Sequence, residues 1–78
     1  MSEHKVIIYS TRSCPYCIIA KEYLERIGVS FENKDVGKDP AAGEEMVRKS
    51  GQMGVPVLDI DGHILVGFDP EAYDELLK

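Results

Sequence analysis

The chain has 78 residues, of which 44% are apolar and 29% charged, and 9 basic against 14 acidic side chains give a net charge of −5. This length predicts one domain over residues 1–78, and the apolar content supplies one core, which argues against a disordered chain. The acidic balance disfavours nucleic-acid binding, which needs a basic face, and no apolar run approaches the roughly 20 residues of a membrane span.

The first elements expected along the chain are a buried strand and a helix. Residues 1–5 lead into an apolar run without a cleavage site, which is unlike a signal peptide and predicts a cytoplasmic protein. Residues 6–9, which form that run, are typical of a strand buried on both faces. From Pro15 onward, apolar residues recur at helical spacing until Gly28, which is expected to end the helix. The expected buried side of this helix holds Cys17, Ala20, Tyr23, Leu24 and Ile27.

Residues 30–36 predict a second, more exposed strand, and residues 40–50 a second helix. Asp39 and Pro40 are typical of a helix start, and Gly51 is typical of a helix end. The apolar side of this helix is thin and holds Ala42, Met46 and Val47.

The C-terminal part of the chain predicts a hairpin and a last helix. Asp61 and Gly62 lie between the apolar runs 55–60 and 63–66, which is a strong signal for a two-residue hairpin turn. The helix is expected over residues 71–78. The inward-facing residues expected here are Leu58, Ile60 and Leu65 on one face of the hairpin, Val57, Ile64 and Val66 on the other, and Tyr73, Leu76 and Leu77 on the helix. The element order is therefore β-α-β-α-β-β-α, with the first two strands parallel, the last two antiparallel and helices on both faces.

Cys14 and Cys17 are the two cysteines of the chain and are separated by Pro15 and Tyr16. A secreted mini-protein held by disulfides would carry more cysteines, spread along its sequence. A bridge between two cysteines so close would close a very small loop and stabilise the fold little. The pair therefore indicates redox chemistry or metal binding.

The position of Cys14 favours redox chemistry. Cys14 lies just before the first turn of the predicted helix, where unpaired backbone N–H groups and the helix dipole stabilise a thiolate and lower its pKa. Arg12 is a candidate source of further positive charge. Cys17 lies one turn later, within bonding reach. We expect Cys14 to attack a substrate disulfide and Cys17 to resolve the mixed disulfide, while Tyr16 packs beside the reactive thiol.

A zinc site is the main alternative for the cysteine pair. Structural zinc needs four ligands, and the further candidates are His4 and His63, which lie far apart in the sequence without motif spacing. Both histidines are expected on the surface. We therefore expect no metal site.

Three features of the sequence resemble the glutaredoxins over essentially the whole chain. These are Cys14-Pro15-Tyr16-Cys17 after a strand, Val55-Pro56 before a hairpin, and a glycine-containing turn before the last helix. The resemblance is greatest to small glutaredoxin-like redoxins near those that supply electrons to ribonucleotide reductase. It implies a thioredoxin fold with a four-stranded mixed sheet, no tightly bound cofactor, and glutathione as a candidate co-substrate.

The resemblance also implies which residues bind the substrate. The Val55–Pro56 peptide is expected to be cis, and the Val55 backbone to pair with a bound peptide or glutathione like an added strand. The predicted substrate-binding residues are Arg12, Pro15, Tyr16, Val55, Pro56, Gly67, Phe68 and Asp69.

Two departures from the glutaredoxin pattern affect glutathione. Thr11 stands where glutaredoxins often carry a lysine that faces a glutathione carboxylate. Gly67-Phe68 replaces a Gly-Gly pair, and Pro70 removes a backbone donor from the following helix start. These changes weaken the implied glutathione site, and the Gly-Phe pair is more typical of redoxins reduced by thioredoxin reductase.

The sequence therefore predicts a monomeric dithiol oxidoreductase that carries electrons to protein or glutathione mixed disulfides in cell redox homeostasis. Its expected reductant is thioredoxin reductase or glutathione. One alternative is a glutathione-linked module that binds an iron–sulfur cluster or a metal. Another is an interaction domain in which the thiols are incidental.

Overall fold

The computed structural model describes residues 4–77, and the predicted element order is confirmed. The expectations for residues 1–3, and for Lys78 at the end of the last helix, lie outside the described residues. The elements are β1 (Val6–Ser10), α1 (Pro15–Arg26), β2 (Glu32–Asp35), α2 (Pro40–Ser50), β3 (Val57–Ile60), β4 (His63–Val66) and α3 (Pro70–Leu76).

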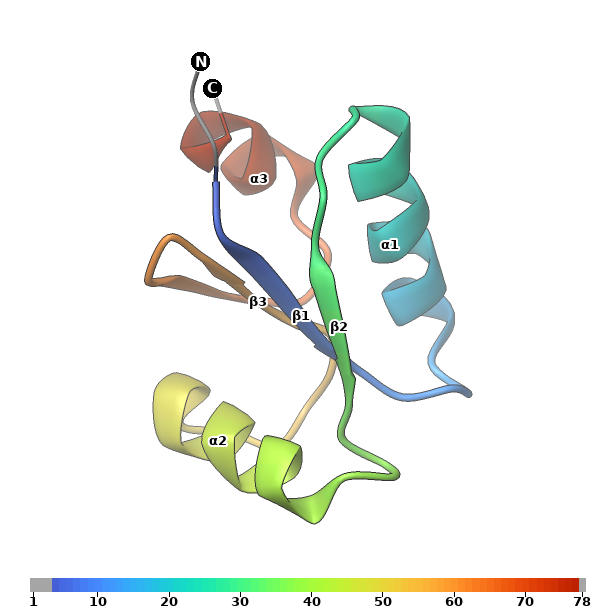
Figure 1. Cartoon of the computed structure of the whole chain (residues 1–78), viewed down its shortest axis with the longest axis vertical. Coiled ribbons are helices and arrows are strands. Elements are labelled where there is room, and N and C mark those ends of the chain that lie inside the picture. Colours follow the sequence, from blue (N-terminus) through green and yellow to red (C-terminus); the bar gives the residue numbers. More distant parts are fainter. Residues whose placement is uncertain (1–3, 78) are drawn as a thin grey trace.

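Within residues 4–77 the strands form one mixed sheet in the order β2-β1-β3-β4. β1 runs parallel to β2 and antiparallel to β3, which pairs with β4 in the predicted hairpin. Helices α1 and α3 cover one face of the sheet and α2 covers the other (Figure 1). The carboxyl end of β1 therefore leads directly into α1, and the cysteine pair lies at this junction.

Short local signals set the helix boundaries. Each helix of the described chain has a proline at its first position: Pro15, Pro40 and Pro70. A proline is tolerated there because its missing N–H would have no partner inside the helix. The Asp39 carboxylate accepts hydrogen bonds from the first backbone N–H groups of α2, and Gly51 ends that helix with a φ of 75°.

The sheet separates two apolar clusters. The larger lies under α1 and α3, and the smaller lies under α2. The buried members of the larger cluster are Val6, Ile8, Ala20, Leu24, Leu58, Ile60 and Tyr73. Those of the smaller cluster are Ile7, Tyr9, Met46 and Val57.

Three residues expected in the core are instead exposed: Ile27, Val47 and Val66. Ile27 follows the last residue of α1, so helical spacing no longer fixes its direction. Val47 lies one position beyond Met46, which takes the inward place on α2. Val66 ends the edge strand β4, outside the cluster that α2 covers, and is 54% exposed.

Charged side chains of α2 form ion pairs and hydrogen bonds with the sheet. Lys49 on α2 lies 2.7 Å from Asp59 on β3 and donates to the Tyr9 hydroxyl on β1. Glu45 on α2 accepts hydrogen bonds from Tyr9 and from Lys34 on β2. These two bonds lower the pKa of Glu45 to about 2, so its carboxylate keeps its charge at neutral pH. The helix is thereby tied to three strands of the sheet.

Candidate active site

Cys14 stands at the junction of β1 and α1 and is partly exposed. It is the residue that precedes α1, with an extended backbone (φ −89°, ψ 112°). Its carbonyl accepts from the backbone N–H of Cys17 at 3.1 Å. Cys17 lies in the first turn of the helix and is buried, and both residues are free thiols. The two sulfurs therefore differ in access, and Cys14 is the one that a partner can reach.

The two thiols shift each other's pKa in opposite directions. Burial by itself would raise the pKa of Cys14, but hydrogen bonds from the Cys17 thiol and from the backbone N–H groups of Cys17 and Tyr16 lower it below the ordinary value. Burial and the neighbouring Cys14 raise the pKa of Cys17 to about 11. Arg12 is exposed and is not among the groups that act on Cys14. Of the two thiols, Cys14 therefore ionises more readily than Cys17.

This asymmetry predicts the pH dependence of alkylation. Because the Cys14 pKa is lowered, the thiolate persists to lower pH, and its reaction with iodoacetamide should rise through a midpoint below the ordinary value of a free cysteine. Cys17 should stay protonated across that range. The rate is measured against pH by mass spectrometry. Cys17→Ala, which removes a hydrogen bond to Cys14, should move the midpoint upward, and a wild-type midpoint at or above the ordinary value would contradict the assignment.

A groove of about 290 Å³ lies beside Cys14 and brings together residues from three segments of the chain. It is lined by Tyr16, Val55, Pro56, Gly67 and Phe68, all from the predicted substrate-binding set. The Val55–Pro56 peptide is cis, as the resemblance implies. Cys14 Sγ lies 3.8 Å from the Val55 carbonyl oxygen, and the Tyr16 side chain is 61% exposed. The partly exposed Cys14 thiol therefore lies next to Val55, one of the residues that line the groove.

The turn before α3 forms one wall of this groove. Gly67 has a φ of 86°, a conformation that favours glycine, and its N–H donates to the Pro56 carbonyl at 2.7 Å. The Phe68 ring packs edge-on against Tyr23, with centroids 5.9 Å apart, and against Tyr73, at 5.8 Å. Phe68 thus lines the groove and also anchors this wall in the core.

The other predicted residues lie outside the groove lining. Pro15 starts α1 and is exposed, and the exposed Asp69 caps α3 by accepting from the Ala72 N–H at 3.3 Å. Thr11 contributes through its backbone, because its N–H bonds to Cys17 and partly offsets the rise in the Cys17 pKa. Sequence reasoning missed this role, since a backbone N–H gives no residue-type signal.

The site and fold place the chain among known proteins. Residues 6–65 match the sequence profile of the glutaredoxin family. The chain belongs to the glutaredoxin family. A glutaredoxin-like 8.6 kDa protein of the rubredoxin operon of Clostridium pasteurianum is 45% identical over 71 residues, which cover 91% of this chain and 95% of that protein. Glutaredoxin 3 of Escherichia coli is 41% identical over 64 residues, 82% of this chain and 77% of that protein.

Solved structures agree with this family. The NrdH-redoxin of Escherichia coli, a glutaredoxin-like protein, has a TM-score of 0.81 and 29% identity, covering 92% of this chain and 93% of its own. The chain thus has the thioredoxin-like fold that the resemblance implied. Membership of the glutaredoxins makes it a thiol–disulfide oxidoreductase in general terms, of a family that acts on disulfides, draws on a reductant and needs no tightly bound cofactor.

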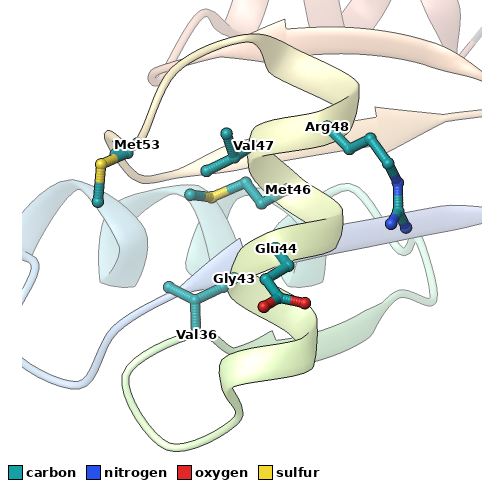
Figure 2. A pocket seen from close by; sticks show the side chains of 7 residues that line it. All are labelled: Val36, Gly43, Glu44, Met46, Val47, Arg48 and Met53. Atoms are coloured by element: carbon teal, nitrogen blue, oxygen red, sulfur yellow. The ribbon is translucent and has the colours of Figure 1, made fainter.

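A second, larger hollow of about 590 Å³ lies along α2 of this glutaredoxin (Figure 2). Its apolar side chains are Val36, Met46, Val47 and Met53, and Met53 is 81% exposed. Gly43, Glu44 and Arg48 complete the lining, which contains no cysteine. The sequence did not predict this hollow, because it forms where α2 meets residues from the segments before and after it. It offers apolar contact and no nucleophile.

The histidines do not extend the cysteine site. His4 is partly buried rather than on the surface as expected, because its Nδ1 lies 2.6 Å from Asp61 Oδ2 at the hairpin turn. His63 is exposed. Within residues 4–77, no three His, Cys, Asp or Glu side chains gather in a way that could hold a metal ion. In the same residues, no helix is long and apolar enough to cross a membrane.

Proposed function

We propose that this glutaredoxin is a dithiol electron carrier that reduces protein disulfides, with Cys14 as the nucleophile and Cys17 as the resolving thiol. The observation that carries the proposal is the paired arrangement of the two thiols. The accessible Cys14 has a lowered pKa, and the buried Cys17 that hydrogen-bonds to it has a raised one. Ionisation is therefore easier for the attacking thiol than for the second thiol, which holds its proton more tightly.

The proposed reaction transfers two electrons. The Cys14 thiolate attacks one sulfur of the substrate disulfide, and the other sulfur leaves as a thiolate that takes a proton. Cys17 then loses its proton and attacks Cys14 Sγ, and the second substrate sulfur leaves as a thiolate that takes up that proton. The substrate gains two thiols, and the protein is left with a Cys14–Cys17 disulfide. An external reductant must return two electrons, and one proton then restores the Cys14 thiolate and the Cys17 thiol.

The groove is the proposed binding place for the polypeptide around the substrate disulfide. Its walls come from the Val55–Pro56 segment, whose Val55 carbonyl lies 3.8 Å from Cys14 Sγ, and from the Gly67–Phe68 turn. A chain lying there in extended form would pair with the Val55 backbone. Tyr16 and Phe68 offer aromatic surface to its side chains.

We propose thioredoxin reductase, rather than glutathione, as the source of electrons. Glutathione carries two carboxylates, which need donors or cations. Thr11 is uncharged, Pro70 lacks an N–H, and the Asp69 carboxylate already accepts from the Ala72 N–H at the start of α3. A glutathione carboxylate at the start of α3 would be repelled by the negative charge of Asp69. The Escherichia coli NrdH-redoxin, which resembles this chain, is described as having a thioredoxin-like activity profile.

The choice of reductant is tested by NADPH consumption with insulin as the disulfide substrate. One reaction contains thioredoxin reductase, and the other contains glutathione with glutathione reductase. We expect turnover in the first to exceed that in the second by at least about tenfold, the factor that one lost charge-assisted hydrogen bond accounts for. Equal rates, or a faster glutathione reaction, would contradict this proposal. Both reactions run without the protein give the background.

The other candidate functions have less support. A cluster held with glutathione would need the same carboxylate site that Thr11 and Pro70 weaken. An interaction domain with incidental thiols would not need Cys14 and Cys17 to have pKa values shifted in opposite directions.

A further inference from the structure

Tyr73 on α3 carries a hydroxyl group that the disulfide exchange does not use. Its side chain is fully buried against the sheet. The hydroxyl donates a hydrogen bond to the Gly67 carbonyl oxygen at 2.6 Å. Burial raises the pKa of Tyr73 to about 12, so the hydroxyl keeps the proton that it donates. A buried donor and a turn of the substrate groove are thus joined directly.

Tyr73 contacts the groove wall in two independent ways. The Tyr73 hydroxyl donates to the Gly67 carbonyl, while the Gly67 N–H donates to the Pro56 carbonyl at 2.7 Å. The Tyr73 ring packs edge-on against Phe68, with centroids 5.8 Å apart. Gly67, Phe68 and Pro56 all line the groove. The wall is therefore connected through Gly67 to the cis-proline segment, whose Val55 carbonyl lies beside Cys14 Sγ.

We propose that Tyr73 is a positioning residue that fixes the width of the substrate groove by holding Gly67 through its hydroxyl. The inference rests on the proposed function, because the groove matters only if a polypeptide disulfide binds there. Tyr73 is not among the groups that shift the pKa of Cys14, so it should affect binding of a large disulfide substrate and leave the reactivity of Cys14 unchanged. Loss of the hydroxyl would leave the Gly67 carbonyl without this partner and free the turn to move.

The chain offers a matched pair of variants. Tyr73→Phe removes the hydroxyl and keeps the ring that packs on Phe68. Tyr23→Phe removes a hydroxyl from the same aromatic cluster, but that hydroxyl bonds to the exposed Asp74 and not to the groove. Each pre-reduced protein is mixed with increasing insulin without any reductase, and the half-saturating insulin concentration and the limiting rate are measured. Iodoacetamide alkylation against pH reports Cys14 reactivity, and thermal unfolding reports the fold.

Tyr73→Phe should raise the half-saturating insulin concentration by about fivefold, the effect expected of one neutral hydrogen bond. The limiting rate and the alkylation profile of Tyr73→Phe should match those of wild type. Tyr23→Phe should match wild type in the half-saturating insulin concentration, the limiting rate and the alkylation profile. Unchanged saturation in Tyr73→Phe, or the same rise in both variants, would overturn the proposal.

Hydrogen exchange at the Gly67 amide separates this proposal from the proposed function. This amide bonds to Pro56 and should exchange faster in Tyr73→Phe than in wild type or Tyr23→Phe. If the wild-type protein does not reduce insulin, the proposed function fails. The positioning role is then judged on this amide alone, and equal exchange in the three proteins overturns it.

Discussion

Cys14→Ser is expected to abolish insulin reduction while leaving the fold intact. A serine hydroxyl does not ionise near neutral pH, so the nucleophile is lost. Cys17 cannot replace it, because this thiol is fully buried and its pKa is raised to about 11. The rate should therefore fall by at least about 1,000-fold, since the thiolate is the reacting species in disulfide exchange. The measurement is NADPH consumption with thioredoxin reductase and insulin.

Ser13→Ala is the matched control for this variant. Ser13 is the exposed neighbour of Cys14 and does not line the groove, so its replacement should leave the rate unchanged. Thermal unfolding of both variants should follow that of wild type, because Cys14 is partly exposed and lies outside the apolar clusters. Cys14→Ser that keeps more than roughly a tenth of the wild-type rate would show that Cys14 is not the thiolate nucleophile.

The fold could be predicted where short segments carry their own signals. The prolines and caps at the helix starts, the glycine at the end of α2 and the Asp61-Gly62 turn depend on backbone geometry that a few residues decide. The errors at Ile27, Val47 and Val66 have a different origin. Whether an apolar residue is covered depends on where a helix ends and how far another element reaches, and a local pattern does not contain this information.

The candidate site shows the same division. The position of Cys14 before a helix predicted its lowered pKa, whereas the raised pKa of Cys17 was not predicted, because it depends first on burial in the folded chain. The groove joins segments far apart in the sequence, and its residues came from the resemblance to glutaredoxins. Neither the sequence pattern nor the resemblance predicted the hydrogen bond of the Tyr73 hydroxyl. Its inward direction followed from helical spacing, but its partner is a backbone carbonyl that the tertiary fold brings to it.

The hollow along α2 was missed for a related reason. Val36 and Met53 lie on opposite sides of α2 in the sequence, and Val47 was expected in the core. An apolar residue that lines an open hollow has the same sequence signature as one that packs inside. The ion pairs that Lys49 and Glu45 of the same helix form with the sheet were not predicted either, because a charged side chain on a helix usually faces solvent.

Cys17→Ser is expected to convert the protein from a catalyst into a trap. Cys14 keeps its thiol and can still attack a disulfide, but the second thiol needed to release the substrate is missing. Serine retains a hydroxyl close to the position from which Cys17 donates to Cys14. Attack should therefore continue, while multiple turnover falls by about 100-fold or more because the mixed disulfide is no longer resolved internally.

The trapped species gives a direct measurement of the order of the two steps. Mass spectrometry of Cys17→Ser after incubation with insulin should show a covalent adduct at Cys14 that dithiothreitol removes. Wild-type protein under the same conditions should show a Cys14–Cys17 disulfide without an adduct. The proposed roles would be reversed if Cys14→Ser formed an adduct at Cys17 while Cys17→Ser formed none at Cys14. Cys14 is partly exposed and Cys17 is buried. The accessibility of the two sulfurs makes the first result the expected one.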